Sequence, residues 1–244
     1  MTTLPLRRSL GALLVVVPLV FTVCFTLLQI QFEYPDILRQ PTADVLAKFQ
    51  AGGPGLVAVW YVLTLTAVLF IPIALLTHRL LAAESAASGV WIATAFGVVA
   101  GLAQTLGFLR WPFLVPHLAQ AYLAPDASAA QQAAASLVFE AFHRYAGMAV
   151  GEHLGYLSTG VWTFLTAAAM VRAPLFGRWL GLIGMVLAAG VLAGLLEPAG
   201  VVWAGTVNAL SYLAWALWLM TAGVVLLTRR AEAPAGYRPA PAAD

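Results

Sequence analysis

The chain has 244 residues, of which 62% are hydrophobic and 9% are charged, and its formal net charge at pH 7 is +2. A soluble domain carries about 25% charged residues, so this chain cannot cover its surface with polar groups. The mean hydropathy of +0.90 indicates a polytopic membrane protein with the lipid bilayer as its solvent and partner. The small net charge gives no indication of nucleic acid as a partner, and none is expected.

Six apolar stretches are long enough to cross a bilayer, since a transmembrane helix needs about 20 mostly apolar residues. The first is too long for a signal peptide and has no Ala-x-Ala site after it, so it is interpreted as a retained helix. The predicted spans are Leu10 to Ile30, Leu56 to Leu76, Val90 to Leu109, Met148 to Val171, Leu180 to Leu196 and Val201 to Leu227. The predicted fold is therefore all-α, with one six-helix transmembrane domain over residues 1–230 and a disordered cytoplasmic tail over 231–244.

The distribution of basic residues predicts the orientation, because cytoplasmic loops of membrane proteins are enriched in Lys and Arg. With the N-terminus inside, the inner segments hold Arg7, Arg8, Arg79, Arg172, Arg178, Arg229, Arg230 and Arg238, and the outer ones hold Arg39, Lys48, Arg110 and Arg144. This excess predicts a multi-pass protein of the cell membrane with both termini cytoplasmic.

The segment between the first and second spans contains one short amphipathic helix. Residues 42–49 place Val45, Leu46 and Phe49 on one face, a pattern typical of a helix that lies on the membrane surface. After the third span, Pro112 and Pro116 are expected to end the helix.

The segment before the fourth span predicts a second outer helix, since Ser128 and Gln131 fit a capping box that begins a helix near Ala129. No proline interrupts the chain from there to residue 173. A single helix over this stretch would be about 65 Å long, roughly twice the hydrocarbon thickness. The helix must therefore either project from the membrane or bend near Gly147. We expect a bend, with residues 129–145 lying across the outer mouth as an amphipathic extracytoplasmic segment.

The most informative segment is FEAFHRYAGMAVGEHLGY, residues 139–156, at the start of the fourth span. Its ionisable side chains are Glu140, His143, Arg144, Glu152 and His153. Each such group is costly to bury in hydrocarbon, so a cluster of them at one membrane boundary indicates a functional site.

Glu140 and His143 are three residues apart, so both lie on one helical face. Glu-x-x-His on two helices forms a carboxylate-bridged di-iron site, but here the pattern occurs once. The alternative is a surface ion pair between Glu140 and Arg144. His117 could face His143 or His153 as a haem ligand, which leaves a redox protein as a further alternative.

Glu152 is expected about one helical turn inside the membrane, on the same face as Tyr156. A carboxylate at that depth must be paired or protonated. Arg110, at the outer end of the third span, is the expected partner. Glu152 is therefore either half of a structural ion pair or a proton-exchanging group.

Two further patterns point to the outer half of the bundle. Gly147, Gly151 and Gly155 repeat at every fourth residue and form a ridge that allows close helix approach. Intramembrane polar residues of other spans are expected at the same level as Glu152, namely Gln29, Gln104 and Asn208.

The sequence lacks the motifs of several other functional classes. The sequence has no Walker A motif, no Gly-x-Ser-x-Gly, no His-Glu-x-x-His and no Asp-rich prenyl-diphosphate motif. These absences argue against an ATP-driven pump, a serine hydrolase, a zincin and a magnesium-dependent prenyltransferase.

Three segments together resemble the DUF4386 family of bacterial polytopic membrane proteins of unknown function. They are Leu109-Arg110-Trp111-Pro112, the run from Phe139 to Gly147, and Gly151-Glu152-His153-Leu154-Gly155-Tyr156 followed by Trp162-Thr163. The resemblance implies a six-helix integral membrane fold and supplies no activity.

The functional hypothesis therefore rests on the residues themselves. It is a polar pocket on the extracytoplasmic side that binds a lipophilic small molecule with a polar head. Glu152, His153 and His143 are predicted to transfer protons, and Arg110, His117, Glu140, Arg144 and Tyr156 to contact the ligand, with an arginine holding an anionic head. No metal ligand is assigned, and no cofactor is identified. The alternatives are a non-enzymatic structural or partner-binding component and a metal- or haem-binding redox protein.

Overall fold

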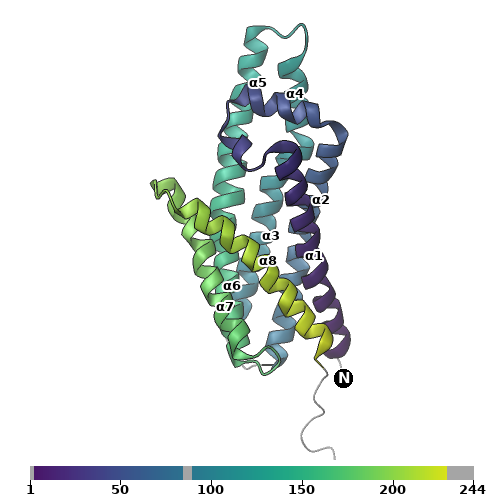
Figure 1. The fold of residues 1–244 in the computed structure, drawn as a ribbon, viewed down its shortest axis with the longest axis vertical. Helices are drawn as coiled ribbons and strands as arrows, with labels where there is room; N and C mark the ends of the chain where they lie inside the picture. The colour runs from purple at the N-terminus through teal and green to yellow at the C-terminus, as the bar shows by residue number, and fades with distance from the viewer. Residues whose placement is uncertain (1–2, 85–89, 230–244) are drawn as a thin grey trace, which may run out of the picture.

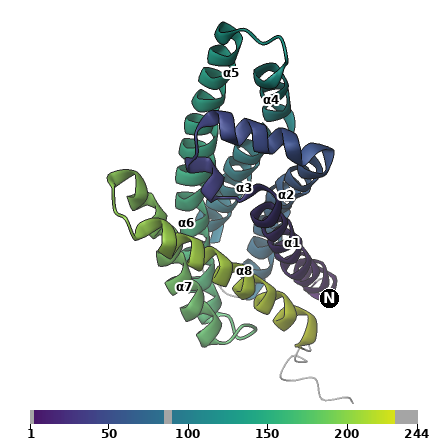
Figure 2. The ribbon, with the colours of Figure 1, turned by 45° about the horizontal axis from the view of Figure 1, so that its top comes forward.

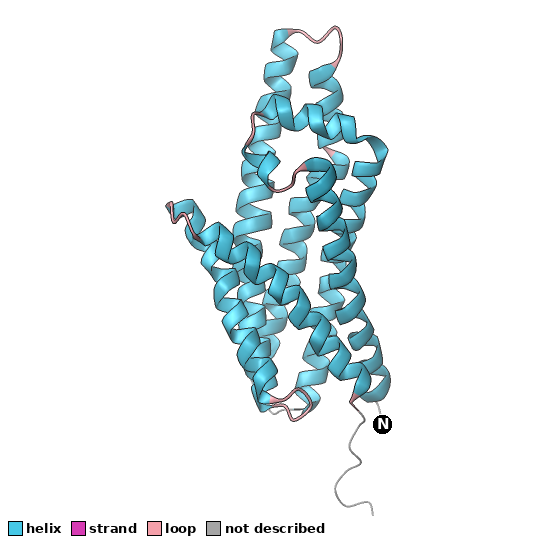
Figure 3. Cartoon of the chain, viewed as in Figure 1, coloured by secondary structure: helices cyan, strands magenta, loops and turns pink. Residues whose placement is uncertain are grey.

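In the computed structural model, residues 3–84 and 90–229 are described, and within them the chain forms helices joined by turns, with no strand (Figure 3). Six helical segments of this part are long and apolar enough to cross a membrane. They are Leu4–Phe32, Thr42–Glu84, Val90–Leu123, Ala129–Arg172, Arg178–Ala199 and Ala204–Thr228. This confirms the all-α fold with six spans, whereas the predicted tail at 231–244 lies outside the described residues.

The spans run along the long axis of the molecule (Figure 1). The elements are α1 (Thr3–Phe32), η1 (Asp36–Arg39), α2 (Thr42–Glu84), α3 (Val90–Phe113), α4 (Val115–Leu123), α5 (Ala129–Phe142), η2 (His143–Leu154), α6 (Gly155–Arg172), α7 (Arg178–Ala193), η3 (Gly194–Ala199) and α8 (Ala204–Thr228). The N-terminus and the last turn of α8 lie at one end, here called the terminal end. The α4–α5 pair lies at the other, here called the hairpin end.

The helices α4 and α5 form a hairpin that extends beyond the other spans (Figures 1 and 2). As predicted, α3 ends at the two prolines, since its last residue is Phe113. After a turn at Leu114 the chain resumes as α4, with Pro116 in its first turn. The predicted capping box is confirmed. The Ser128 hydroxyl accepts the Gln131 backbone N–H at 3.3 Å, and the Gln131 side chain accepts the Ser128 N–H at 2.8 Å.

The expected bend near Gly147 is wrong. The helix continues from α5 through η2 into α6, and α5 projects along the bundle axis instead of lying across its mouth (Figures 1 and 2). The physical reason is that α5 finds a partner, since it packs against α4 while η2 packs against α3. The segment η2 is a π-helix, a wider form of helix that keeps the chain direction while changing which side chains face inward.

The amphipathic helix predicted between the first two spans is present, and its apolar face packs against protein. It forms the first part of α2, residues 42–52, and ends at a kink where Gly53 has a φ of 58°. Val45, Leu46 and Phe49 are each at most 2% exposed. They pack into an aromatic cluster at the hairpin end, so the apolar face is covered by the bundle itself.

That aromatic cluster consists of Phe32, Phe49, Trp60, Trp111 and Phe139. The Trp60 and Trp111 rings stack with centroids 4.7 Å apart, and Phe32 meets Trp111 edge-on at 5.2 Å. Because its members come from α1, both parts of α2, α3 and α5, the cluster fixes the hairpin end against the membrane-spanning helices.

A buried arginine, Arg7, and an exposed one, Arg229, join the helix ends at the terminal end. Arg7 donates to the Arg229 carbonyl at 2.6 Å, and Arg229 donates to the carbonyls of Pro174 and Leu175. Cations are favourable at helix C-termini, where carbonyl groups lack helical partners. The arginines thus tie α1 to α8 and to the turn between α6 and α7.

The fifth and sixth spans are joined by a tight connection. The 3-10 helix η3 follows α7 directly, and Gly200, with a φ of 84°, reverses the chain towards α8. In both ribbon views this connection stands away from α1 (Figures 1 and 2).

Candidate functional site

The site is built around the place where α3 and η2 touch. A Cβ atom built on Gly107 would lie 2.8 Å from the Gly151 Cα atom, so the two backbones are in direct contact. Glycine at both positions is therefore required by the close approach. One turn along the ridge, Gly147 leaves the space that the Arg110 guanidinium occupies.

Arg110 is only 8% exposed. Its Nη1 donates to the Gly107 carbonyl, and its guanidinium carbon lies 5.1 Å from the centroid of the Trp111 ring. These contacts fix the positive charge inside the protein without a carboxylate partner at ion-pair distance.

The direct ion pair expected between Arg110 and Glu152 is not formed. Among the described residues, the ion pairs within 4.0 Å are Arg39–Asp36, Arg39–Glu197 and Lys48–Glu33. Glu152 nevertheless lies within the electrostatic influence of Arg110, Glu197 and Arg39. The carboxylate and the guanidinium are thus close enough to interact and far enough apart to leave both groups available to a third.

Glu152 is half-buried and lines a pocket between η2 and η3. The pocket encloses about 390 Å³, open space at its mouth included, and its other lining residues are Met148, His153, Tyr156, Gly194, Glu197 and Pro198. A carboxylate therefore faces an open volume at the hairpin end, where a ligand has room to reach it.

Three tyrosines lie within the electrostatic influence of Glu152. Tyr34, in the turn after α1, packs edge-on against Trp60 at 5.1 Å. Burial raises the pKa of the Tyr34 phenol, and the negative charge of Glu152 raises it further, while Arg110 opposes both. The phenol therefore stays protonated and able to donate a hydrogen bond.

The other two tyrosines come from α6 and α8. The rings of Tyr156 and Tyr212 lie 5.7 Å apart, and Tyr212 shares a side-chain hydrogen bond with Thr159. Both tyrosines are within the electrostatic influence of Glu152. We call Tyr34, Arg110, Glu152, Tyr156 and Tyr212 the interior cluster.

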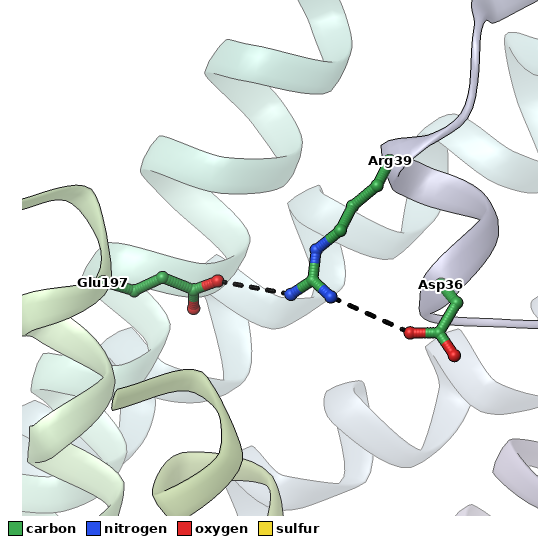
Figure 4. Close-up of polar contacts among 3 residues, drawn as sticks. All are labelled: Asp36, Arg39 and Glu197. Carbon is green, nitrogen blue, oxygen red and sulfur yellow. Dashed lines mark ion pairs between the residues drawn. The ribbon is translucent and has the colours of Figure 1, made fainter. Parts of the chain in front are cut away.

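An exposed ion pair lies at the rim of the interior cluster. Arg39 of η1 is 3.6 Å from Glu197 of η3 and 3.8 Å from Asp36, and Figure 4 shows its guanidinium between the two carboxylates. η3 otherwise stands away from α1. The contact between Arg39 and Glu197 therefore links η3 to η1, the short helix that follows α1. Exposed pairs of this kind contribute about 0–1 kcal/mol, so the bridge is easily broken.

The sequence-predicted residues divide into two groups. Arg110, Glu152 and Tyr156 belong to the interior cluster. His143 is half-buried, stacks on Phe139 with centroids 5.9 Å apart, and lies within the electrostatic influence of Arg110. His153 is exposed but lines the pocket.

The remaining predicted residues lie outside the cluster. Glu140 is exposed and accepts a hydrogen bond from the Thr42 hydroxyl at 3.2 Å, so it does not pair with Arg144 as one alternative proposed. Arg144 and His117 are exposed, on η2 and α4. Within residues 3–84 and 90–229, no group of three or more His, Cys, Asp or Glu side chains is placed to hold a metal ion.

The three intramembrane amides do not converge as expected. Gln104 donates to the Thr159 hydroxyl at 3.0 Å, directly beside the interior cluster. Asn208 donates to the Val191 carbonyl at 2.7 Å, which explains it as a contact between α7 and α8. Gln29 is exposed on α1.

Sequence reasoning missed Tyr34, Thr159, Glu197 and Tyr212. Tyr212 follows Asn208 by one helical turn, a spacing that places both on one face and would have indicated it. Tyr34 carries no such signal, because it lies in an irregular turn whose path depends on the packing of Trp60. Glu197 reaches the site only through the position of η3.

Comparison with known proteins gives one match. The family model described as "Domain of unknown function (DUF4386)" matches residues 9–223, from within α1 to within α8. Neither the curated proteins nor the solved structures contain a match to this chain. With six membrane-spanning helices and a family match over most of its length, this multi-pass membrane protein belongs to the DUF4386 family.

Proposed function

We propose that this protein binds a lipophilic small molecule in the membrane and holds its polar head at the interior cluster. The observation that carries the proposal is the placement of Arg110 and Glu152, a buried and a half-buried charge that interact electrostatically without an ion pair within 4.0 Å. Ionisable groups in such a place are costly, and a bound polar head would supply the hydrogen bonds that they lack.

The cluster favours a neutral head that both donates and accepts hydrogen bonds, such as the hydroxyl of an isoprenoid alcohol or the ring of a quinone-like lipid. Glu152 offers an acceptor, and Tyr34 offers a protonated donor. An anionic head held by an arginine is less well supported. Arg110 already donates to the Gly107 carbonyl, and Arg144 lies exposed away from the cluster.

Glu152 is the proposed proton-exchanging group. It faces the pocket, and its charge is balanced by Arg110 without a direct ion pair that would hold it in one state. His143, beside Arg110, and His153, in the pocket wall, are the proposed relays to solvent.

The proposed location is the cell membrane, with both termini in the cytoplasm. In the structure, Arg7, Arg8, Arg79, Arg172, Arg178 and Arg229 all lie at the ends of helices on the terminal side, in agreement with the positive-inside rule. A thiol reagent that cannot cross membranes should label Asp126→Cys in intact cells and leave Leu4→Cys unlabelled until the cells are opened. The reverse pattern would contradict this orientation; native Cys24 is buried and provides the background.

Substitution of Glu152 tests the binding site. Glu152→Gln keeps the shape of the side chain and removes its charge, so the purified variant should keep the wild-type thermal stability in detergent. Its affinity for farnesol should fall about tenfold to a hundredfold, because a hydrogen bond to a charged group contributes about 1.5–3 kcal/mol.

Glu140→Gln is the matched control, since Glu140 is an exposed carboxylate on the same continuous helix. It should leave farnesol binding unchanged. Equal binding by Glu152→Gln and wild type would contradict the proposal. Aggregation of Glu152→Gln, with a stable control, would instead favour the structural role of this carboxylate.

A further inference from the structure

A second, apolar cavity lies below the interior cluster, between α1, α2, α3 and α8. It is a groove with about 490 Å³ of empty space, the space open to the surroundings included. Its lining includes Val17, Phe21, Phe70, Gln104, Tyr212 and Trp215. We call this cavity the apolar slot.

A series of contacts between aromatic rings links the lining of the apolar slot to the interior cluster. Phe70 and Trp215 have centroids 5.6 Å apart, Trp215 and Tyr212 5.8 Å, and Tyr212 and Tyr156 5.7 Å. Tyr212 belongs to both sites, since it lines the slot and shares a hydrogen bond with Thr159. A molecule with its head at Glu152 would thus have its tail directed past these rings.

The slot lies where α1 and α8 separate. The two helices touch at Gly11 and Gly223, where a Cβ atom built on Gly223 would lie 2.7 Å from the Gly11 carbonyl oxygen. From this crossing they diverge towards the hairpin end (Figures 1 and 2). Neighbouring side chains on both helices are exposed on the lipid-facing surface, among them Leu19 at 51% and Leu217 at 62%.

We infer that the apolar slot holds the hydrocarbon tail of a single-chain lipid, which enters from the bilayer between α1 and α8. The inference rests on the proposed function, because the head of the same molecule would lie at the interior cluster. The aromatic walls suit an unsaturated isoprenoid chain, whose flat segments pack against ring faces.

A chain-length series tests the inference with one head group. Wild-type protein should bind geraniol, farnesol and geranylgeraniol with affinity that rises along the series, because each added isoprene unit buries more apolar surface. Ala216→Phe places a ring inside the slot, where Ala216 is only 6% exposed. This variant should bind geranylgeraniol about tenfold more weakly and geraniol with little change.

Ala209→Phe is the matched control, since it adds the same ring to an exposed position of α8 and should leave the series unchanged. If wild type and both variants show the same rise with chain length, the slot does not hold the tail, although the proposed function survives. If wild type binds none of the three alcohols, the proposed function itself fails for this ligand class.

A second measurement needs no substitution and so covers a variant that fails to fold. Farnesol with a photoreactive diazirine at its tail is crosslinked to the wild-type protein, and the labelled peptides are identified by mass spectrometry. The label should map to the slot-lining parts of α1, α2 and α8, near Phe21, Ala67 and Trp215. Labelling confined to the lipid-facing surface would overturn the inference.

Discussion

At the scale of single residues, the site depends on where a positive charge can be held in an apolar region. Arg110 is held by a carbonyl, by the face of Trp111 and by the space that Gly147 leaves free. A guanidinium can use all three, because it is flat, donates in several directions and stacks on aromatic rings. The carboxylate of Glu152 is thereby left facing the pocket instead of being consumed in an ion pair.

The contact between Gly107 and Gly151 sets the distance between Arg110 and Glu152, and it can be tested directly. Gly107→Ala would place a methyl group 2.8 Å from the Gly151 Cα atom, so the two backbones must separate. Overpacking of this kind costs about 1–3 kcal/mol, which exceeds the roughly 0.5–1 kcal/mol gained from alanine in a helix. We therefore expect a lower midpoint of thermal unfolding in detergent and weaker farnesol binding.

Gly55→Ala is the control for this substitution. Gly55 lies in α2 with no atom within 4 Å of a Cβ built on it, so the same change should be neutral or slightly stabilising. Equal effects of the two substitutions would show that helix propensity, and not the close approach of α3 and η2, explains the result.

At the scale of elements, the sequence predicted what local patterns determine and missed what packing determines. The spans, the capping box at Ser128 and the short helix at residues 42–52 follow from hydrophobic length, side-chain chemistry and periodicity. The predicted bend at Gly147 was wrong because a helix of roughly twice the hydrocarbon thickness was expected to bend, whereas it projects beyond the other spans (Figure 1). In the structure α4 packs against α5. The sequence of neither segment, taken alone, reveals this pairing.

The same distinction holds for the candidate site. Arg110, Glu152 and Tyr156 could be predicted, because charged and polar residues are conspicuous in apolar spans. Tyr34 and Glu197 could not, since the turn after α1 and the position of η3 bring them in. The π-helical form of η2 was also unpredicted, although two glycines next to ionisable residues mark the place where a wider helix can still approach α3.

At the scale of the whole molecule, the two ends of the bundle differ in construction. The terminal end is closed by arginines that bind helix carbonyls, and α1 and α8 touch there. Towards the hairpin end the same helices diverge (Figure 1), and an exposed ion pair between Arg39 and Glu197 joins η1 to η3. A polar cluster above an apolar slot is the arrangement expected of a site for a lipid with a small polar head.

The most direct test of this account is native mass spectrometry of the wild-type protein, purified in mild detergent without added lipid. The account predicts one retained lipophilic molecule per chain, released by Glu152→Gln and kept by Glu140→Gln. A wild-type chain without any retained molecule, or one whose bound lipid is indifferent to Glu152, would contradict the central claim that the interior cluster is a lipid-binding site.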